Sequence, residues 1–107
     1  MSQFDLKRDG KMLTVVSGGD FTAVLIPDLK PAVQKAIEEG ITEVVFDLGK
    51  TTILDSTGIG FTIAVYNSLT KKGGTMRVVN VSDDILRLLQ SMRLDQRLGV
   101  KAANQEK

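Results

Sequence analysis

The stretch that decides the fold is EVVFDLGKTTILDSTGIGF, residues 43–61. Its first part, Glu43–Leu48, is a nearly unbroken apolar run, which is typical of a central strand covered on both faces. Its last residues open Ile59–Leu69, a segment with the length and composition of a helix. A core strand that leads through a short polar loop into a helix indicates an α/β domain.

The residues before this stretch predict a hairpin and a helix. Asp9–Gly10 is a turn signal, and the residues after it include the strand-favouring Met12, Leu13, Val15 and Val16. From Asp28 onward, apolar residues recur at helical spacing. With Asp28 as N-cap, Pro31 falls in the first turn, where no intrahelical donor is needed. Gly40 ends this helix.

The residues after it repeat the alternation. Gly73 is expected at the C′ position of the preceding helix, followed by a strand at Thr75–Val81 and by Ser82 as the next N-cap. Residues 94–102 predict a turn or short helix and then a short strand. The buried stripe of the third helix is expected to comprise Ile85, Leu88, Leu89 and Met92, with Met76 and Met92 as core filler.

This alternation predicts one α/β domain over residues 1–107, in which residues 103–107 form a frayed tail. The sheet is expected to be mixed and largely parallel, with four to five strands and three to four helices. Neither a linker nor an internal repeat suggests a second domain.

Composition excludes several kinds of chemistry. The chain has no His and no Cys, so it can form neither a Ser-His-Asp triad nor a thiolate or imidazole metal site. We therefore expect no metal, no cofactor and no catalysis by this chain alone. Fourteen Lys and Arg balance thirteen Asp and Glu, and aromatic residues make up only 5%, which argues against nucleic acid as a partner. No apolar run has the length of a membrane span or of a signal-peptide core, so we expect a cytoplasmic protein without a membrane partner.

Asp55 and Ser56 stand where the core strand leads into the helix. In open α/β sheets, functional groups gather at the carboxyl ends of strands, and a helix N-terminus favours negative charge. Ser56 is either a simple N-cap, with Asp55 complementing the helix dipole, or a hydroxyl presented to a partner. The helix that follows is apolar nearly all round, with Ile59, Phe61 and Val65 among its residues. Either a docking patch or burial on two sides accounts for that composition.

The sequence resembles the bacterial anti-sigma factor antagonists, whose fold is called the STAS domain. The resemblance covers nearly the whole chain and includes Gly19–Thr22, the VVFDL strand, Asp55–Gly60 and the basic, glycine-containing end at Lys71–Gly74. It implies partner switching. By this resemblance, an anti-sigma factor that is also an ATP-dependent serine kinase is expected to phosphorylate Ser56. The unphosphorylated antagonist would bind that kinase and release its sigma factor, and a PP2C-type phosphatase would restore the serine.

The resemblance also implies a set of partner-binding residues around Ser56. Asp55 would help to position the hydroxyl, while Gly58 and Gly60 would allow the partner's backbone to approach closely. In one respect the chain departs from the family, which often has the motif Gly-Glu-apolar-Asp at this place. Asp20 keeps the first acid of the motif, whereas Thr22 replaces the second acid. The expected partner-binding residues are Asp20, Thr22, Asp55, Ser56, Thr57, Gly58, Ile59, Gly60, Phe61 and Val65.

Two other roles are open to such a chain. A STAS domain can be a scaffold or adaptor in a larger assembly, such as a stressosome or a lipid-transport complex, and a monomeric state in isolation would favour the switching antagonist instead. An enzyme that uses Asp55 or Ser56 is disfavoured because no histidine is available to activate the hydroxyl.

Overall fold

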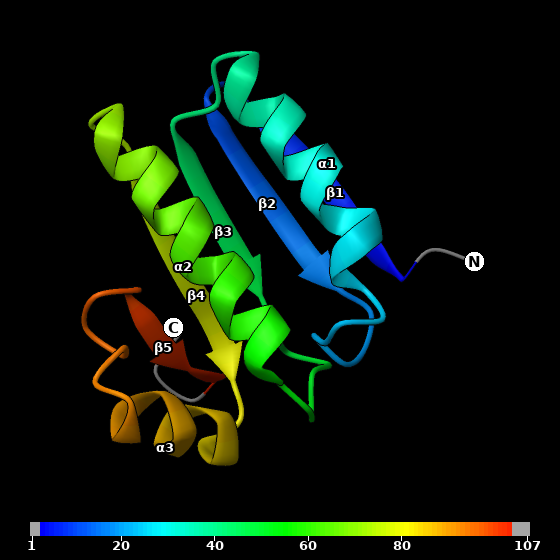
Figure 1. The fold of residues 1–107 in the computed structure, drawn as a ribbon, viewed down its shortest axis with the longest axis vertical. Helices are drawn as coiled ribbons and strands as arrows, with labels where there is room; N and C mark the ends of the chain where they lie inside the picture. The colour runs from blue at the N-terminus through cyan, green and yellow to red at the C-terminus, as the bar shows by residue number, and fades with distance from the viewer. Residues whose placement is uncertain (1–2, 104–107) are drawn as a thin grey trace.

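A five-stranded sheet forms the centre of the structure, a computed structural model that describes residues 3–103. The strands lie side by side in the order of the chain, and three helices connect or follow them (Figure 1). The strands are β1 (Phe4–Asp9), β2 (Met12–Ser17), β3 (Glu43–Asp47), β4 (Thr75–Val81) and β5 (Val100–Ala102). The helices are α1 (Ile26–Glu38), α2 (Ser56–Lys71) and α3 (Asp83–Ser91).

The sheet is mixed and mostly parallel, as the alternation of elements predicts. Strand β1 pairs antiparallel with β2 through a hairpin, whereas β2, β3, β4 and β5 pair parallel to one another. Gly10 closes the hairpin with a φ of 62°, a conformation that glycine adopts without strain. The parallel strands β2, β3 and β4 all end at the same edge of the sheet, where α1 and α2 begin (Figure 1).

The core lies between the sheet and the helices α1 and α2, which cover one of its faces (Figure 1). All three apolar residues in the middle of β3 are buried, as expected for the central strand. Phe21, Phe46 and Phe61 form a cluster in which ring centroids lie 5.8 to 6.3 Å apart. This cluster joins the loop after β2, strand β3 and the second turn of α2, and so it supports the edge where these elements meet.

Helix α1 begins earlier than its capping residues predict. Its first residue is Ile26, not a residue after Asp28, and its N-cap Leu25 makes no side-chain capping bond. Burial of Leu25 and Ile26 accounts for the difference, because packing of these side chains outweighs a local capping preference. Pro31 therefore lies inside the helix, where it cannot donate a hydrogen bond to the carbonyl of Pro27.

Helix α3 buries a narrower stripe than its sequence predicts. Ile85 and Leu89 are buried, but Leu88 is 38% and Met92 45% exposed. Residues four apart lie above one another, so Ile85 and Leu89 form one line of buried side chains on this nine-residue helix, and the half-buried Leu86 packs against the core beside it. Met76 is buried as expected, and Ser82 is the N-cap, since its side chain accepts a hydrogen bond from the N–H of Ile85.

The C-terminal segment also follows the expected order. A turn precedes the short strand β5, which extends the sheet beside β4. The tail that we expect to be frayed, residues 103–107, lies outside the described residues except for Ala103.

Candidate functional site

The candidate site lies at the carboxyl ends of β2 and β3, where two loops run together. One loop precedes α1 and the other precedes α2. Phe21 and Leu54 form an isolated parallel bridge between these loops, and the N–H of Phe21 donates to the carbonyl of Ile53 at 2.9 Å. The segments Gly19–Thr22 and Asp55–Gly60 are thus neighbours at one edge of the sheet.

Asp55 joins the two loops through its carboxylate. Its Oδ1 accepts from the N–H of Gly58 at 2.9 Å, which makes it the N-cap of α2, and its Oδ2 accepts from the N–H of Ala23 at 3.0 Å. These two hydrogen bonds, first that of Gly58 and then that of Ala23, lower the pKa of Asp55 below its ordinary value of 3.8. Asp55 therefore caps the helix, which corrects the interpretation of Ser56 as a simple N-cap.

Ser56 is the first residue of α2, and its side chain is exposed. Within the described residues, its hydroxyl takes part in no side-chain hydrogen bond, including none with the carboxylate of Asp55. Thr57, the next residue, is exposed as well. The serine is therefore accessible at a helix N-terminus, where the macrodipole favours negative charge.

The two glycines of the motif have different surroundings. A Cβ atom at Gly58 would lie 2.2 Å from the backbone oxygen of Phe21, so glycine is required there for the two loops to pack. Gly58 is buried, and the structure corrects the expectation that it receives a partner's backbone. Gly60 is exposed, and a Cβ atom added there would have no neighbouring atom within 4 Å, so its lack of a side chain has no packing reason.

The apolar residues of α2 belong mainly to the core. Ile59 is only 8%, Phe61 5% and Val65 4% exposed. These three side chains pack against the sheet and α1 and do not form a docking patch, which corrects the expectation that they bind a partner directly. Burial on two sides explains the nearly all-round apolar composition of this helix.

Asp20 and Thr22 lie in the loop before α1. Asp20 is exposed, and its carboxylate accepts a hydrogen bond from the hydroxyl of Thr52 at 3.1 Å. Thr22 is half-buried, and its carbonyl accepts from the N–H groups of Leu25 and Ile26 at the start of α1. The structure thus places both residues in the loop that adjoins the Asp55–Gly60 segment.

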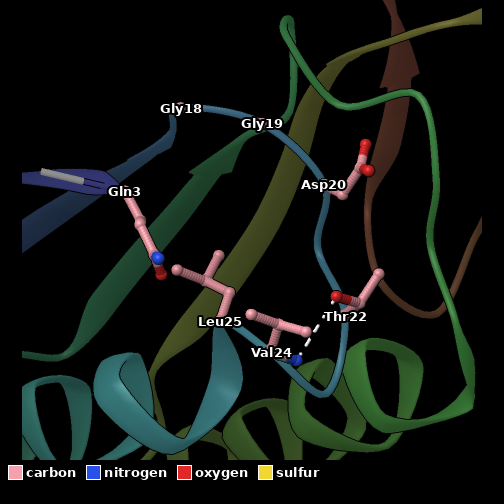
Figure 2. A pocket seen from close by; sticks show the side chains of 7 residues that line it. All are labelled: Gln3, Gly18, Gly19, Asp20, Thr22, Val24 and Leu25. Atoms are coloured by element: carbon pink, nitrogen blue, oxygen red, sulfur yellow. Dashed lines mark hydrogen bonds between the residues drawn. The ribbon is translucent and has the colours of Figure 1, made fainter.

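A pocket of about 430 Å³ opens beside this loop (Figure 2). Figure 2 shows the side chains of Gln3, Leu25 and Val24 on one side of the backbone at Gly18 and Gly19, while the carboxylate of Asp20 points away from them. The residues that line the pocket are Gln3, Gly18, Gly19, Asp20, Thr22, Val24 and Leu25.

Sequence reasoning missed four residues of this region. Val24 and Ile53 are the two most exposed large hydrophobic residues described, at 76% and 56%. Their sequence signal was an aliphatic side chain inside a predicted loop. Ser17 and Thr51 are buried, and both hydroxyls donate to the carbonyl of Gly19 at 2.7 Å. Thr51 thereby holds the loop before α2 against the loop before α1, whereas Ser17 braces the start of the loop that follows its own strand. No local pattern indicated either role.

The described residues contain no group of three or more metal-binding side chains. Over residues 3–103, no helix combines the length and the apolar character that a membrane crossing requires.

Comparison with known proteins supplies the family. The family model of the STAS domain matches residues 3–106. An anti-sigma-B factor antagonist from Listeria monocytogenes is 26% identical over 96 residues, which are 89% of this chain and 83% of that protein.

Solved structures share the fold. An anti-sigma factor antagonist from Mycobacterium paratuberculosis gives a TM-score of 0.78 at 22% identity, over 92% of this chain and 83% of that one. SpoIIAA, a cell fate determinant of Bacillus, gives 0.77 in its phosphorylated form at 16% identity, over 92% and 90% of the two chains. In its unphosphorylated form it gives 0.72 at 16% identity, over 81% of each chain. The chain belongs to the STAS domain family.

Proposed function

We propose that this protein is an anti-sigma factor antagonist whose switch is the hydroxyl of Ser56. The unphosphorylated protein binds an anti-sigma factor that is also a serine kinase, and the sigma factor is released. The observation that carries the proposal is the exposed hydroxyl of Ser56 at the N-terminus of α2, in a chain of the STAS family. The anti-sigma-B factor antagonists among its relatives support the same role.

In this proposal the chain is a substrate and catalyses nothing. The Ser56 oxygen attacks the γ-phosphorus of ATP, the bond to the bridging oxygen of ADP breaks, and the hydroxyl proton passes to a base of the kinase. This chain has no histidine that could take that proton. A PP2C-type phosphatase then hydrolyses the phosphate ester and restores the serine.

Phosphorylation should act on the interface and leave the fold intact. A phosphate adds about −1.5 to −2 charges, and the N-terminus of α2 stabilises negative charge. SpoIIAA supports this separation, since the fold of this chain matches both its phosphorylated and its unphosphorylated form. Neither charge nor helix dipole gives a reason for the domain to unfold.

A docked partner, in contrast, would have to desolvate the phosphate beside the carboxylate of Asp55. An unpaired charge buried at an interface costs roughly 3–5 kcal/mol. At about 1.4 kcal/mol for each factor of ten, binding weakens by roughly a hundredfold to a few thousandfold. The residues expected to contact the partner are the exposed or half-buried ones around Ser56, namely Asp20, Thr22, Asp55, Thr57 and Gly60.

The test is phosphorylation by the serine-kinase anti-sigma factors of the source genome. Each is incubated with ATP and the protein, and the modified residue is identified by peptide mass mapping. We expect modification of Ser56 alone, loss of modification in Ser56→Ala, and normal modification in the control Ser68→Ala, which removes another exposed serine of α2. Modification at a different residue, or equal kinase binding by the phosphorylated and unphosphorylated forms, would contradict the proposal.

A switching antagonist is expected to be a cytoplasmic monomer when it is free. Native mass measurement of the purified protein tests the oligomeric state. A large, stable assembly of this chain would favour the scaffold role instead.

A further inference from the structure

Two exposed aliphatic side chains lie in the two loops that meet at the candidate site. Val24 lies in the loop before α1, and Ile53 lies in the loop before α2, three residues from the serine. They are 76% and 56% exposed. Exposed aliphatic residues are common when single, but two on adjoining loops at a candidate site indicate a contact with another molecule.

Hydrogen bonds fix the backbone at or next to both residues relative to the loop that leads to Ser56. The carboxylate of Asp55 binds the N–H of Ala23, the residue before Val24. The carbonyl of Ile53 accepts from the N–H of Phe21, whose ring is buried in the aromatic cluster. A partner that contacts Val24 and Ile53 therefore meets Ser56 in a defined orientation, with little loop ordering needed on binding.

The pocket beside Val24 has a mixed lining, in which the apolar side chains of Val24 and Leu25 lie beside the polar side chains of Gln3 and Thr22. Two of its backbone groups are occupied: the N–H of Gly18 donates to the carbonyl of Gln3, and the carbonyl of Gly19 accepts from two hydroxyls. The carboxylate of Asp20 points away from Val24 and Leu25 (Figure 2) and accepts from Thr52.

The charge of these loops indicates the surroundings of the apolar contact. The two loops, residues 18–25 and 48–55, contain the acids Asp20 and Asp55 and one base, Lys50. Asp55 is bound by two backbone N–H groups, whereas Asp20 is exposed and its described partner is a neutral hydroxyl. A complementary partner would present apolar side chains to Val24 and Ile53, and a Lys or Arg to Asp20.

We propose that Val24 and Ile53 are the apolar anchors through which the anti-sigma factor kinase docks on this protein, with a cationic side chain of the kinase facing Asp20. This inference rests on the proposed function. The two loops are then the docking surface that brings Ser56 to the ATP of the kinase. The apolar part of the interface lies on these loops and not on α2.

The experiment compares Val24→Thr, Ile53→Thr and the double variant with wild type. Both changes are at exposed positions and keep the side chain β-branched, so the melting temperature should not change. Met92→Thr is the matched control, because Met92 is 45% exposed and lies at the end of α3. Binding to each purified serine-kinase anti-sigma factor of the source genome is measured by calorimetry, and phosphorylation of Ser56 is measured over a range of substrate concentrations.

We expect each anchor variant to bind about tenfold more weakly than wild type, a loss typical of an anchoring residue, and Met92→Thr to bind normally. Docking residues act before the chemical step, so KM should rise while kcat stays near its wild-type value. Wild-type affinity in the double variant, with Ser56 still phosphorylated, would overturn this inference and leave the switch standing. If no such kinase binds or modifies the wild-type protein, the proposed function fails, and this inference fails with it.

Discussion

Replacement of the two motif glycines by alanine should change stability in opposite directions. Gly58 and Gly60 both lie in the first turns of α2, so helix propensity alone favours Gly→Ala by about 1 kcal/mol at each position. At Gly60 no steric conflict opposes this gain, because the added methyl group meets no atom within 4 Å beyond its own stretch of helix. The Gly60→Ala variant should therefore have a free energy of unfolding up to about 1 kcal/mol higher than that of wild type.

At Gly58 the added methyl group meets the other loop. It would lie 2.2 Å from the backbone oxygen of Phe21, 2.9 Å from Cδ2 of its ring and 3.0 Å from Cδ1 of Leu54. A backbone atom cannot rotate away, so the loop before α1 has to shift and its bond from Phe21 to Ile53 weakens. Overpacking costs about 1–3 kcal/mol, and a backbone contact belongs at the upper end of that range. After the propensity gain, Gly58→Ala should lose about 2 kcal/mol.

Thermal unfolding followed by circular dichroism separates these outcomes. For a domain of this size, 1 kcal/mol corresponds to roughly 4–8 °C in Tm. We expect a Tm at least about 8 °C below wild type for Gly58→Ala and at or above wild type for Gly60→Ala. Equal Tm values for the two variants would refute the reasoning that the Phe21 carbonyl demands a glycine.

The same pair tests whether Gly60 is kept bare for a partner. Ser56 and Gly60 are four residues apart and so lie on the same side of the helix. Because Gly60→Ala leaves the fold intact, weaker kinase binding by this variant would assign the missing side chain to partner approach. Normal binding would remove Gly60 from the proposed interface.

Three further predictions concern the supports of the site and the fold. The pKa of Asp55 is lowered by the N–H groups of Gly58 and Ala23, so the stability that its charge contributes is present above about pH 4 and is lost as the pH falls through the folded-state pKa. The difference in Tm between wild type and Asp55→Asn should therefore shrink on acidification. A difference in Tm that stays constant with pH would count against this role of the carboxylate. Ser82→Ala removes the cap of α3 and should cost about 1 kcal/mol in urea unfolding, whereas no change would show that packing alone holds the helix start. Phe21→Ala empties one corner of the aromatic cluster and should cost about 3–5 kcal/mol by the same assay, so a loss below about 1 kcal/mol would contradict its place in the core.

Much of the fold follows from local patterns in the sequence. The apolar run at Glu43–Leu48 predicts the central strand, and Asp9–Gly10 predicts the hairpin. Ser82 marks the start of α3 because its side chain accepts a hydrogen bond from a backbone N–H three residues away. Gly73 marks the end of α2 because glycine adopts the positive φ that follows a helix C-terminus. The Asp55–Gly60 motif indicates both the family and the position of the exposed serine.

Patterns failed where a distant segment competes with a local preference. Asp28 has the right chemistry for an N-cap, yet α1 begins before it because Leu25 and Ile26 are buried. Phe61 and Val65 look equally suited to a docking patch and to a core, and only the sheet packed against them decides for the core. Helical spacing says which residues share a face but not how wide a face the neighbouring elements cover.

By itself, the sequence determined the order of strands and helices, the absence of histidine and cysteine chemistry, and a hydroxyl at the start of α2. Only the tertiary structure decided what surrounds that hydroxyl. The bond between Asp55 and Ala23 joins residues 32 positions apart, and Gly58 is required by the carbonyl of Phe21 rather than by its own helix. The physical reason is range: capping and periodicity act within a few residues, whereas the burial of Val65, the exposure of Val24 and the contact between the two loops depend on which segments the sheet brings together.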